Sequence, residues 1–148
     1  MPDVYQGDEL WALSLVDPDN RRPVDWERRR AALAELRDGV EPTRDTIKLF
    51  LIWRALALRA RRPEAFAGGY TPIDAGERCC AFLREDSVLA ATAVRPSGEG
   101  IELELPQSAA GRWRDVLTGA ELDLRGTVPL ERISFEDWPV ALLERLDH

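Results

Sequence analysis

The chain has 148 residues, of which 45% are hydrophobic and 32% are charged, enough for one domain of ordinary size with its own core. The formal net charge of −7 argues against nucleic acid or an anionic membrane surface as a partner. The single histidine, His148, is the last residue. This nearly excludes a catalytic histidine base and histidine-bound metal, so any catalysis would have to use carboxylates.

The first 25 residues predict loops that carry two polar clusters. The first cluster combines acidic and aromatic residues: Tyr5, Gly7, Asp8, Glu9 and Trp11. The second lies between and beside two prolines: Asp17, Asp19, Asn20, Arg21, Arg22 and Asp25. Carboxylates and guanidinium groups suit the hydroxyls of a sugar, because each hydroxyl both donates and accepts a hydrogen bond. A loop cross-linked by its own Asp–Arg pairs, beside buried aromatic residues, explains the same pattern without a ligand.

Two helices are predicted next, over about residues 26–38 and 43–62. Asp25 is a suitable N-cap for the first. Asp45 lies in the predicted first turn of the second, where an acidic residue suits the helix dipole. Between residues 47 and 58 only Lys48 and Arg54 are polar. A helix that is apolar on nearly all sides is expected to be covered on several faces.

From residue 68 onward the hydrophobic period changes to two, which predicts an antiparallel sheet or sandwich. The segments expected to form strands are 79–84, 88–94, 101–105, 113–117, 122–124, 133–135 and 140–143. The adjacent Cys79 and Cys80 are interpreted as reduced residues buried in the first of these strands, because neighbouring cysteines rarely bridge each other.

Other signals are absent from the sequence. It contains no GxGxxG, P-loop, HExxH or CxxC motif, so we expect no metal and no cofactor. We also expect no signal peptide and no membrane span. Trp26, Trp53 and Trp113 are interpreted as core residues. A glucan-binding platform on the sheet would instead need an exposed pair of Trp113 and Trp138.

The start of the chain resembles the last conserved segment of the α-amylase superfamily, glycoside hydrolase family 13. Pro2, Tyr5, Gly7 and Glu9 fit its Gly-x-Pro-x-x-Tyr-x-Gly-x-Glu pattern at the end of barrel strand eight. Within that superfamily, the chain resembles the maltooligosyltrehalose synthase family. The segments that carry this resemblance are 3–25, 48–49, 63–66, 69–72 and 113–119.

The resemblance implies an α+β fold with two parts. Residues 1–66 would be the remnant of the end of a (β/α)8 barrel, namely the loop after strand eight plus two helices. Residues 67–148 would form a small antiparallel β-sandwich. The implied activity of the whole enzyme is intramolecular transglucosylation, which converts the reducing-end α-1,4 bond of a malto-oligosaccharide into an α,α-1,1 bond. Such an enzyme would work in the cytoplasm.

The three catalytic carboxylates of the superfamily follow barrel strands four, five and seven, so none is expected in this chain. The resemblance implies no catalytic residue here and an inactive isolated chain. Asp17 and Arg21 have the spacing of a pair that holds hydroxyls of the glucosyl unit near the cleavage point. Tyr5 and Glu9 would shape the pocket wall. The alternative interpretation is a non-catalytic module that binds glucan or stabilises the barrel.

The expected partners follow from the same resemblance. They are a malto-oligosaccharide, in the context of the full enzyme, and the missing N-terminal barrel portion. The isolated chain is also expected to self-associate through the apolar face of helix 43–62, at Ile47, Phe50 and Leu51, or to fold its N-terminal segment over that face.

Overall fold

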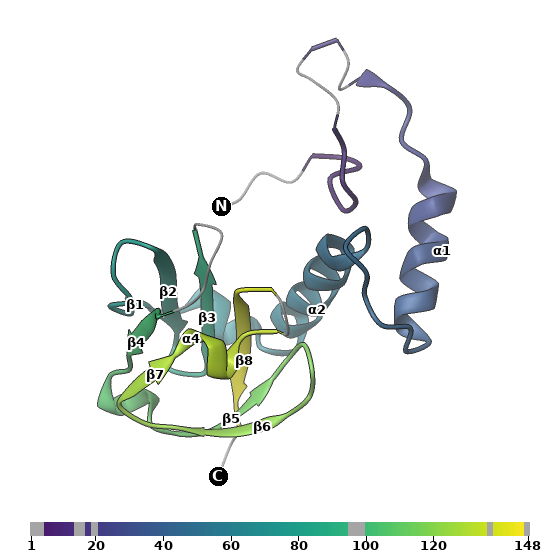
Figure 1. Cartoon of the computed structure of the whole chain (residues 1–148). Helices are drawn as coiled ribbons and strands as arrows, with labels where there is room; N and C mark the ends of the chain where they lie inside the picture. Colours follow the sequence, from purple (N-terminus) through teal and green to yellow (C-terminus); the bar gives the residue numbers. More distant parts are fainter. Residues whose placement is uncertain (1–4, 14–16, 19–20, 95–99, 136–137, 147–148) are drawn as a thin grey trace. The chain divides into compact units, whose positions relative to one another are not determined.

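The computed structural model describes residues 5–13, 17–18, 21–94, 100–135 and 138–146. Pro2, Asp19, Asn20 and His148, which the sequence analysis singled out, lie outside these residues. The chain divides into two compact units, Met1–Arg54 and Ala55–His148, and each is described by itself (Figure 1). The predicted division near residue 66 stays a prediction.

In the first unit, α1 spans Trp26–Arg37, close to the predicted helix 26–38. Its N-terminus is capped as expected, since Asp25 Oδ1 accepts a 2.9 Å hydrogen bond from the Arg28 backbone N–H. The chain leaves the helix at Gly39, whose φ of +92° suits a glycine after a helix. Trp26 itself is 43% exposed, so its interpretation as a core residue is wrong.

The second helix, α2, spans Ile47–Arg61 and begins four residues later than the predicted helix 43–62. The residues before it form a turn instead, in which the Thr43 backbone N–H donates to Thr46 Oγ1 at 2.9 Å. Asp45 therefore precedes the helix rather than lying in its first turn. This side-chain bond offers the backbone an alternative to the helix, which explains the late start.

The apolar face of α2 is covered more fully than expected. Ile47 and Phe50 are buried, and Leu51 is half-buried. Trp53, a predicted core residue, is also half-buried and meets the Phe50 ring edge-on, with 6.1 Å between the centroids. The exposed large apolar residue of this helix is Leu56. Ile47 and Phe50 are thus covered within the chain, and self-association through this helix stays a prediction.

The second unit is built on a six-stranded antiparallel sheet. Its strands, in spatial order, are β1 (Tyr70–Pro72), β2 (Cys79–Arg84), β3 (Val88–Ala93), β8 (Val140–Arg145), β5 (Gly111–Asp115) and β6 (Glu121–Leu124). A second sheet pairs β4 (Glu102–Glu104) with β7 (Thr127–Pro129). The short helices are α3 (Pro63–Ala67), η2 (Gln107–Ala109) and α4 (Leu130–Ile133).

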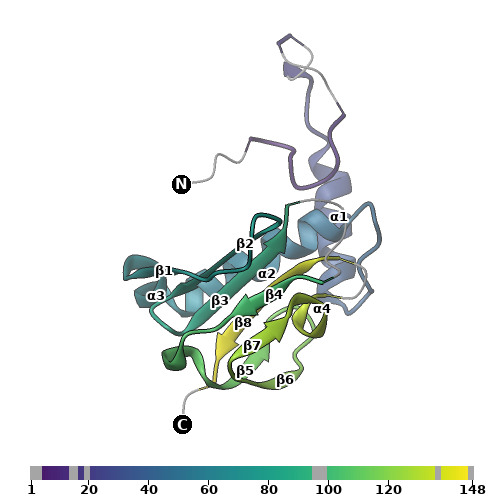
Figure 2. The same ribbon diagram turned by 60° about the vertical axis from the view of Figure 1, so that its left-hand side comes forward.

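The two sheets share one hydrophobic core. Leu83, Leu89 and Leu143 of the larger sheet pack with Leu103 and Val128 of the smaller one, and Figure 2 shows β4 and β7 lying on one side of the larger sheet. Inward-facing residues alternate with outward-facing ones along β2, as a half-buried strand requires. The mixed fold of helices and antiparallel sheets confirms the α+β prediction.

The opposite face of the larger sheet is covered by helix. Leu58 at the end of α2 and Ala65 of α3 form a second cluster with Val88 and Val116. All four side chains are buried. The second unit therefore has three layers, with helix, six-stranded sheet and two-stranded sheet stacked in that order.

Most predicted strands correspond to observed strands, with one clear error. Segment 133–135 was expected to be a strand, but Ile133 ends α4. Phe135 forms an isolated bridge to Trp138 instead. The prediction missed β1, β7, α3 and α4, which are only three to five residues long.

The two cysteines, both free thiols, lie on opposite faces of β2 because side chains alternate along a strand. Cys79 packs against the shared core, whereas Cys80 is exposed, so the expectation that both are buried is wrong. Burial raises the pKa of the Cys79 thiol, more than its backbone hydrogen bond to Thr92 lowers it. At pH 8 a smaller fraction of Cys79 is therefore the reactive thiolate.

We expect iodoacetamide at pH 8 to alkylate Cys80 about three- to tenfold faster than Cys79, because Cys80 is exposed and less of Cys79 is ionised. Single Cys79→Ser and Cys80→Ser variants allow each remaining thiol to be followed alone by mass spectrometry. In urea, where the strand is unfolded, the two rates should converge. Faster alkylation of Cys79 in the folded chain would contradict this account.

Candidate functional site

The predicted site residues all belong to the first unit. Glu9 is held by an arginine from α1, with Arg29 Nε 3.3 Å from Glu9 Oε2. The same guanidinium donates to the carbonyl oxygens of Gly7 at 2.5 Å and Asp25 at 3.0 Å. Arg29 therefore fixes the acidic segment to the start of the helix. The Glu9 carboxylate is mostly shielded from solvent.

Gly7 explains part of the motif at the start of the chain. Its φ is +92°, a conformation that residues with a Cβ rarely adopt. An added Cβ would lie 3.1 Å from the Val24 side chain and 3.2 Å from an Arg29 nitrogen. The glycine therefore allows the turn after Tyr5 to lie directly against the arginine that holds Glu9.

Asp17 and Arg21 form an ion pair, which fits the ligand-free alternative of a loop cross-linked by its own Asp–Arg pairs. The Arg21 backbone N–H also donates to the Pro18 carbonyl oxygen at 3.0 Å, so a turn brings the two side chains together. Both side chains stay more than half exposed. A carboxylate and a guanidinium placed side by side in this way offer acceptors and donors to neighbouring hydroxyls.

Of the four predicted site residues, the structure joins Asp17 with Arg21, whereas Glu9 pairs with Arg29. Among the residues that the structure describes, no hydrogen bond or ion pair joins Asp17 or Arg21 to Tyr5 or Glu9. Tyr5 is 47% exposed, and its carbonyl oxygen closes a turn by accepting from the Asp8 N–H at 3.1 Å. The sequence did not single out Arg29, which lies in a run of three arginines, 28–30.

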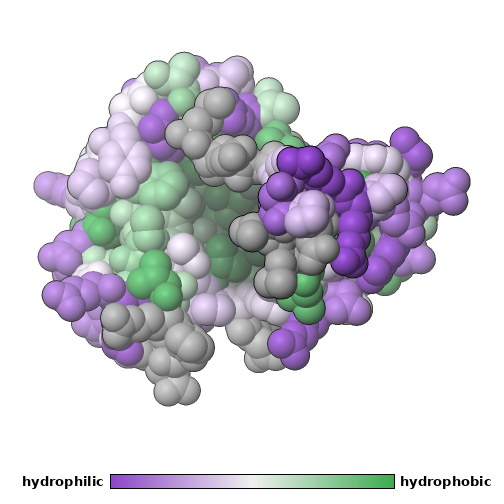
Figure 3. Space-filling model, turned by 90° about the horizontal axis from the view of Figure 1, so that it is seen from above, coloured by the Kyte–Doolittle hydropathy of each residue, from purple (hydrophilic) through white to green (hydrophobic). Residues whose placement is uncertain are grey.

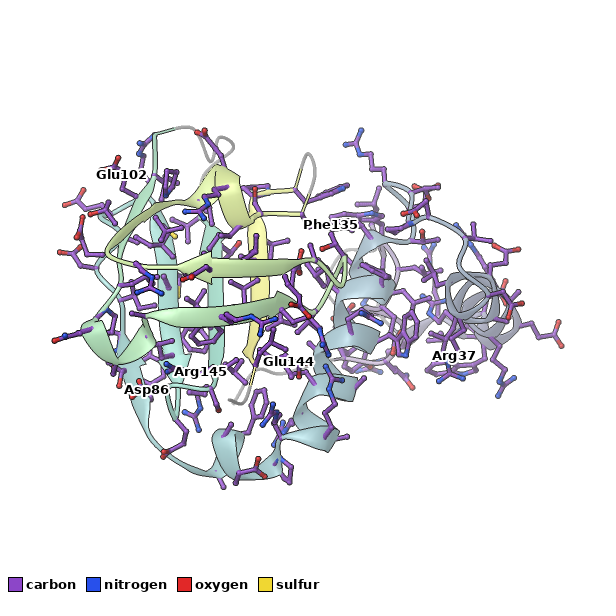
Figure 4. All side chains as sticks on the ribbon, turned by 90° about the horizontal axis from the view of Figure 1, so that it is seen from below. Arg37, Asp86, Glu102, Phe135, Glu144 and Arg145 are labelled. Carbon is purple, nitrogen blue, oxygen red and sulfur yellow. The ribbon has the colours of Figure 1, made fainter. Side chains whose placement is uncertain are left out.

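The buried charges of the second unit are structural. Glu144 on β8 accepts from Arg61 Nε at 3.1 Å, and lies 3.9 Å from an Arg114 nitrogen and 4.0 Å from Arg62 Nε. Figure 4 shows Glu144 and Arg145 on β8. Because its partners come from α2, β5 and the α2–α3 junction, this carboxylate ties the helical layer to the sheet.

A second buried carboxylate, Asp115, shapes the turn between β5 and β6. Its oxygens accept from the Leu117 backbone N–H at 2.8 Å and from the Thr118 hydroxyl at 2.7 Å. Gly119 closes the turn with a φ of +82°. These contacts give segment 113–119 a structural role.

The sheet does not present the tryptophan pair that a glucan-binding platform would need. Trp113 is 0% exposed, and its indole N–H donates to the Ala109 carbonyl oxygen at 2.9 Å. Trp138 is half-buried. The prediction of Trp113 as a core residue is confirmed, and the alternative of a sheet platform is not favoured.

Other features of the molecule lie apart from the predicted site residues. An open pocket of about 220 Å³ is lined by Arg59, Pro63, Phe66 and Ala67, none of them a predicted site residue. In the part of the chain that the structure describes, no group of histidine, cysteine or acidic residues is placed to hold a metal ion. No helix within that same part is both long and apolar enough to span a bilayer. Figure 3 shows hydrophobic residues, in green, among hydrophilic ones at the surface.

Comparison with known proteins gives matches over nearly the whole chain. It is 41% identical to the assigned maltooligosyl trehalose synthase of Mycobacterium tuberculosis strain H37Rv, over 98% of this chain and 19% of that protein. The same values hold for strain CDC 1551. No family model matches the chain.

Solved structures agree with the sequence matches. The maltooligosyltrehalose synthase of Arthrobacter ramosus is 37% identical with a TM-score of 0.79, over 97% of this chain and 20% of that one. A further maltooligosyl trehalose synthase crystal structure is 30% identical with a TM-score of 0.75, over 99% of this chain and 20% of that one. This chain thus spans about a fifth of the length of these relatives. Sequence and fold together show that the chain belongs to the maltooligosyltrehalose synthase family and corresponds to a C-terminal portion of its members.

Proposed function

We propose that this chain is the C-terminal part of a family 13 intramolecular transglucosylase. The enzyme converts the reducing-end α-1,4 bond of a malto-oligosaccharide into an α,α-1,1 bond, which leaves a terminal trehalosyl unit. The observation that carries the proposal is the 41% identity over 98% of the chain to a maltooligosyl trehalose synthase. The reaction is a retaining double displacement through a covalent glycosyl–enzyme intermediate.

In this proposal the chain positions substrate and does not perform the bond chemistry. The catalytic carboxylates belong to the preceding barrel portion, which is the partner of this chain. Asp17 and Arg21 hold hydroxyls of the glucosyl unit near the cleavage point, supported by their exposed ion pair. Tyr5 and Glu9 form part of the pocket wall, supported by the Arg29 contacts that fix Glu9. Residues 1–66 are the end of the barrel in this account.

Two consequences concern the isolated chain. It is inactive, because it lacks the catalytic carboxylates, and the activity belongs to the whole cytoplasmic enzyme. It also self-associates where apolar surface of the helix region is left uncovered by the missing portion. Exposed Leu56 on α2 supports this second point.

The test uses the loss of reducing ends, because an α,α-1,1 bond joins two anomeric carbons and leaves no free one. We expect the 148-residue chain alone to leave the reducing ends of maltopentaose unchanged. A chimera in which this chain replaces the matching segment of the Arthrobacter ramosus enzyme should consume them at a rate within about tenfold of the parent. Activity of the chain alone, or a folded chimera with no activity beside an active parent, would overturn the proposal.

A further inference from the structure

Trp11 is an exposed tryptophan whose orientation is fixed. Its indole Nε1–H donates to the Arg44 carbonyl oxygen at 2.5 Å. The ammonium nitrogen of Lys48 lies over the ring, 5.0 Å from its centroid, within the range of a cation–π interaction. Both partners come from the turn before α2 and from α2 itself. The indole is thus held at its polar edge and on one face.

The same indole keeps a large accessible surface. Trp11 is 48% exposed, and the neighbouring Leu13 is 92% exposed. An indole that is already oriented favours binding, because less side-chain freedom is lost when the ligand arrives. Clustered apolar exposure of this kind is typical of a binding surface.

The surroundings of Trp11 favour a sugar over an apolar partner. The adjacent acidic segment carries Asp8 and Glu9, and Glu9 is in turn paired with Arg29. A pyranose ring presents an apolar C–H face for stacking and hydroxyls for the polar groups around it. An apolar protein surface would offer no hydrogen bond to the Asp8 carboxylate of that segment.

We propose that Trp11 is a preformed stacking platform for one glucosyl unit of an α-1,4-glucan. This inference rests on the proposed function for its choice of sugar. It adds a specificity-determining residue beyond Asp17, Arg21, Tyr5 and Glu9. Because Arg44 and Lys48 hold the indole within the first unit, the platform should bind glucan in the 148-residue chain itself.

The test is a titration of the ¹⁵N-labelled chain with maltopentaose, followed through the five tryptophan indole N–H signals. The Trp11 signal is identified by its loss in Trp11→Phe. We expect it to shift with a dissociation constant of about 1–10 mM. Trp11→Phe should bind within about threefold of the parent chain, and Trp11→Ala at least tenfold more weakly. Lys48→Met should weaken binding about two- to fivefold.

Matched controls test whether binding depends on Trp11 in particular and on the α-1,4 linkage of the sugar. Trp26→Ala removes another exposed tryptophan of the same unit and should leave binding unchanged. Cellopentaose, with β-1,4 bonds, should bind at least fivefold more weakly. If Trp11→Ala does not fold, Trp11→Leu, which keeps apolar volume but has no ring, takes its place and should also bind at least tenfold more weakly. No binding, an unmoved Trp11 signal, unchanged binding by the folded Trp11→Ala or Lys48→Met variant, or equal binding of cellopentaose would each overturn the inference. The proposed function is tested separately by the chimera.

Discussion

Replacing Trp113 with alanine is expected to destabilise the chain by about 3–5 kcal/mol. Trp113 is fully buried on β5, in the core that the two sheets share. The substitution removes the largest fully buried side chain and leaves a cavity that neighbouring strands fill only in part. It also leaves the Ala109 carbonyl oxygen without its indole donor. The measurement is urea unfolding at 25 °C, compared at a constant m-value.

Two further variants separate packing from hydrogen bonding. Trp113→Phe keeps much of the ring volume but loses the N–H donor, so its cost should be smaller, about 1–3 kcal/mol. Trp26→Ala, at an exposed position on α1, should cost less than about 1 kcal/mol. A loss of under 1 kcal/mol in Trp113→Ala would show that this side chain does not anchor the core.

Local sequence signals were sufficient to predict the pairing of strands that are neighbours in the sequence. The β2–β3 hairpin is one example, because its alternating side chains and its short turn determine the register together. Three residues, 85–87, separate the paired Arg84 and Val88, and among them Glu85 and Asp86 have positive φ values of 48° and 49°. Cys79 lies opposite Ala93, and Arg84 opposite Val88. Such pairing needs no information from elsewhere in the chain.

Pairings between strands that are far apart in the sequence could not be predicted from local patterns. β8 lies between β3 and β5 in the sheet, although more than fifty residues separate Leu89 from its partner Leu143. The alternating segment 101–105 looks like any other strand, yet β4 leaves the main sheet and pairs with β7. A strand of three residues, such as β7, is too short to show a period.

The candidate site shows the same limit. Asp–Arg pairing within the loop was expected only as the ligand-free alternative, and Asp17 and Arg21 form such a pair because a short turn brings them together. The role of Arg29 depends on a contact with Glu9, twenty residues away. The sequence offered one local signal, namely that Arg29 lies four residues after Asp25. In the structure Arg29 donates to the Asp25 carbonyl oxygen across this spacing. That signal separates Arg29 from the exposed Arg28 and Arg30 beside it.

Asp17→Asn is expected to lower kcat/KM of the chimeric enzyme about 10- to 100-fold with maltopentaose as substrate, because a hydrogen bond to a charged group is lost where a substrate hydroxyl is held. The amide keeps the size of the side chain but loses the charge that pairs with Arg21. Asp45→Asn, in an exposed carboxylate before α2, is the matched control and should stay within twofold. The assay is again the loss of reducing ends.

Arg21→Lys tests whether the two residues act as a pair. Lysine keeps the positive charge but lacks the planar fork that holds a carboxylate and a hydroxyl together, so we expect a loss of about tenfold. If Asp17 and Arg21 hold one glucosyl unit jointly, the double variant Asp17→Asn/Arg21→Lys should lose far less than the product of the single losses. Multiplicative losses would mean that the residues act independently, and losses under threefold would remove both from the substrate site.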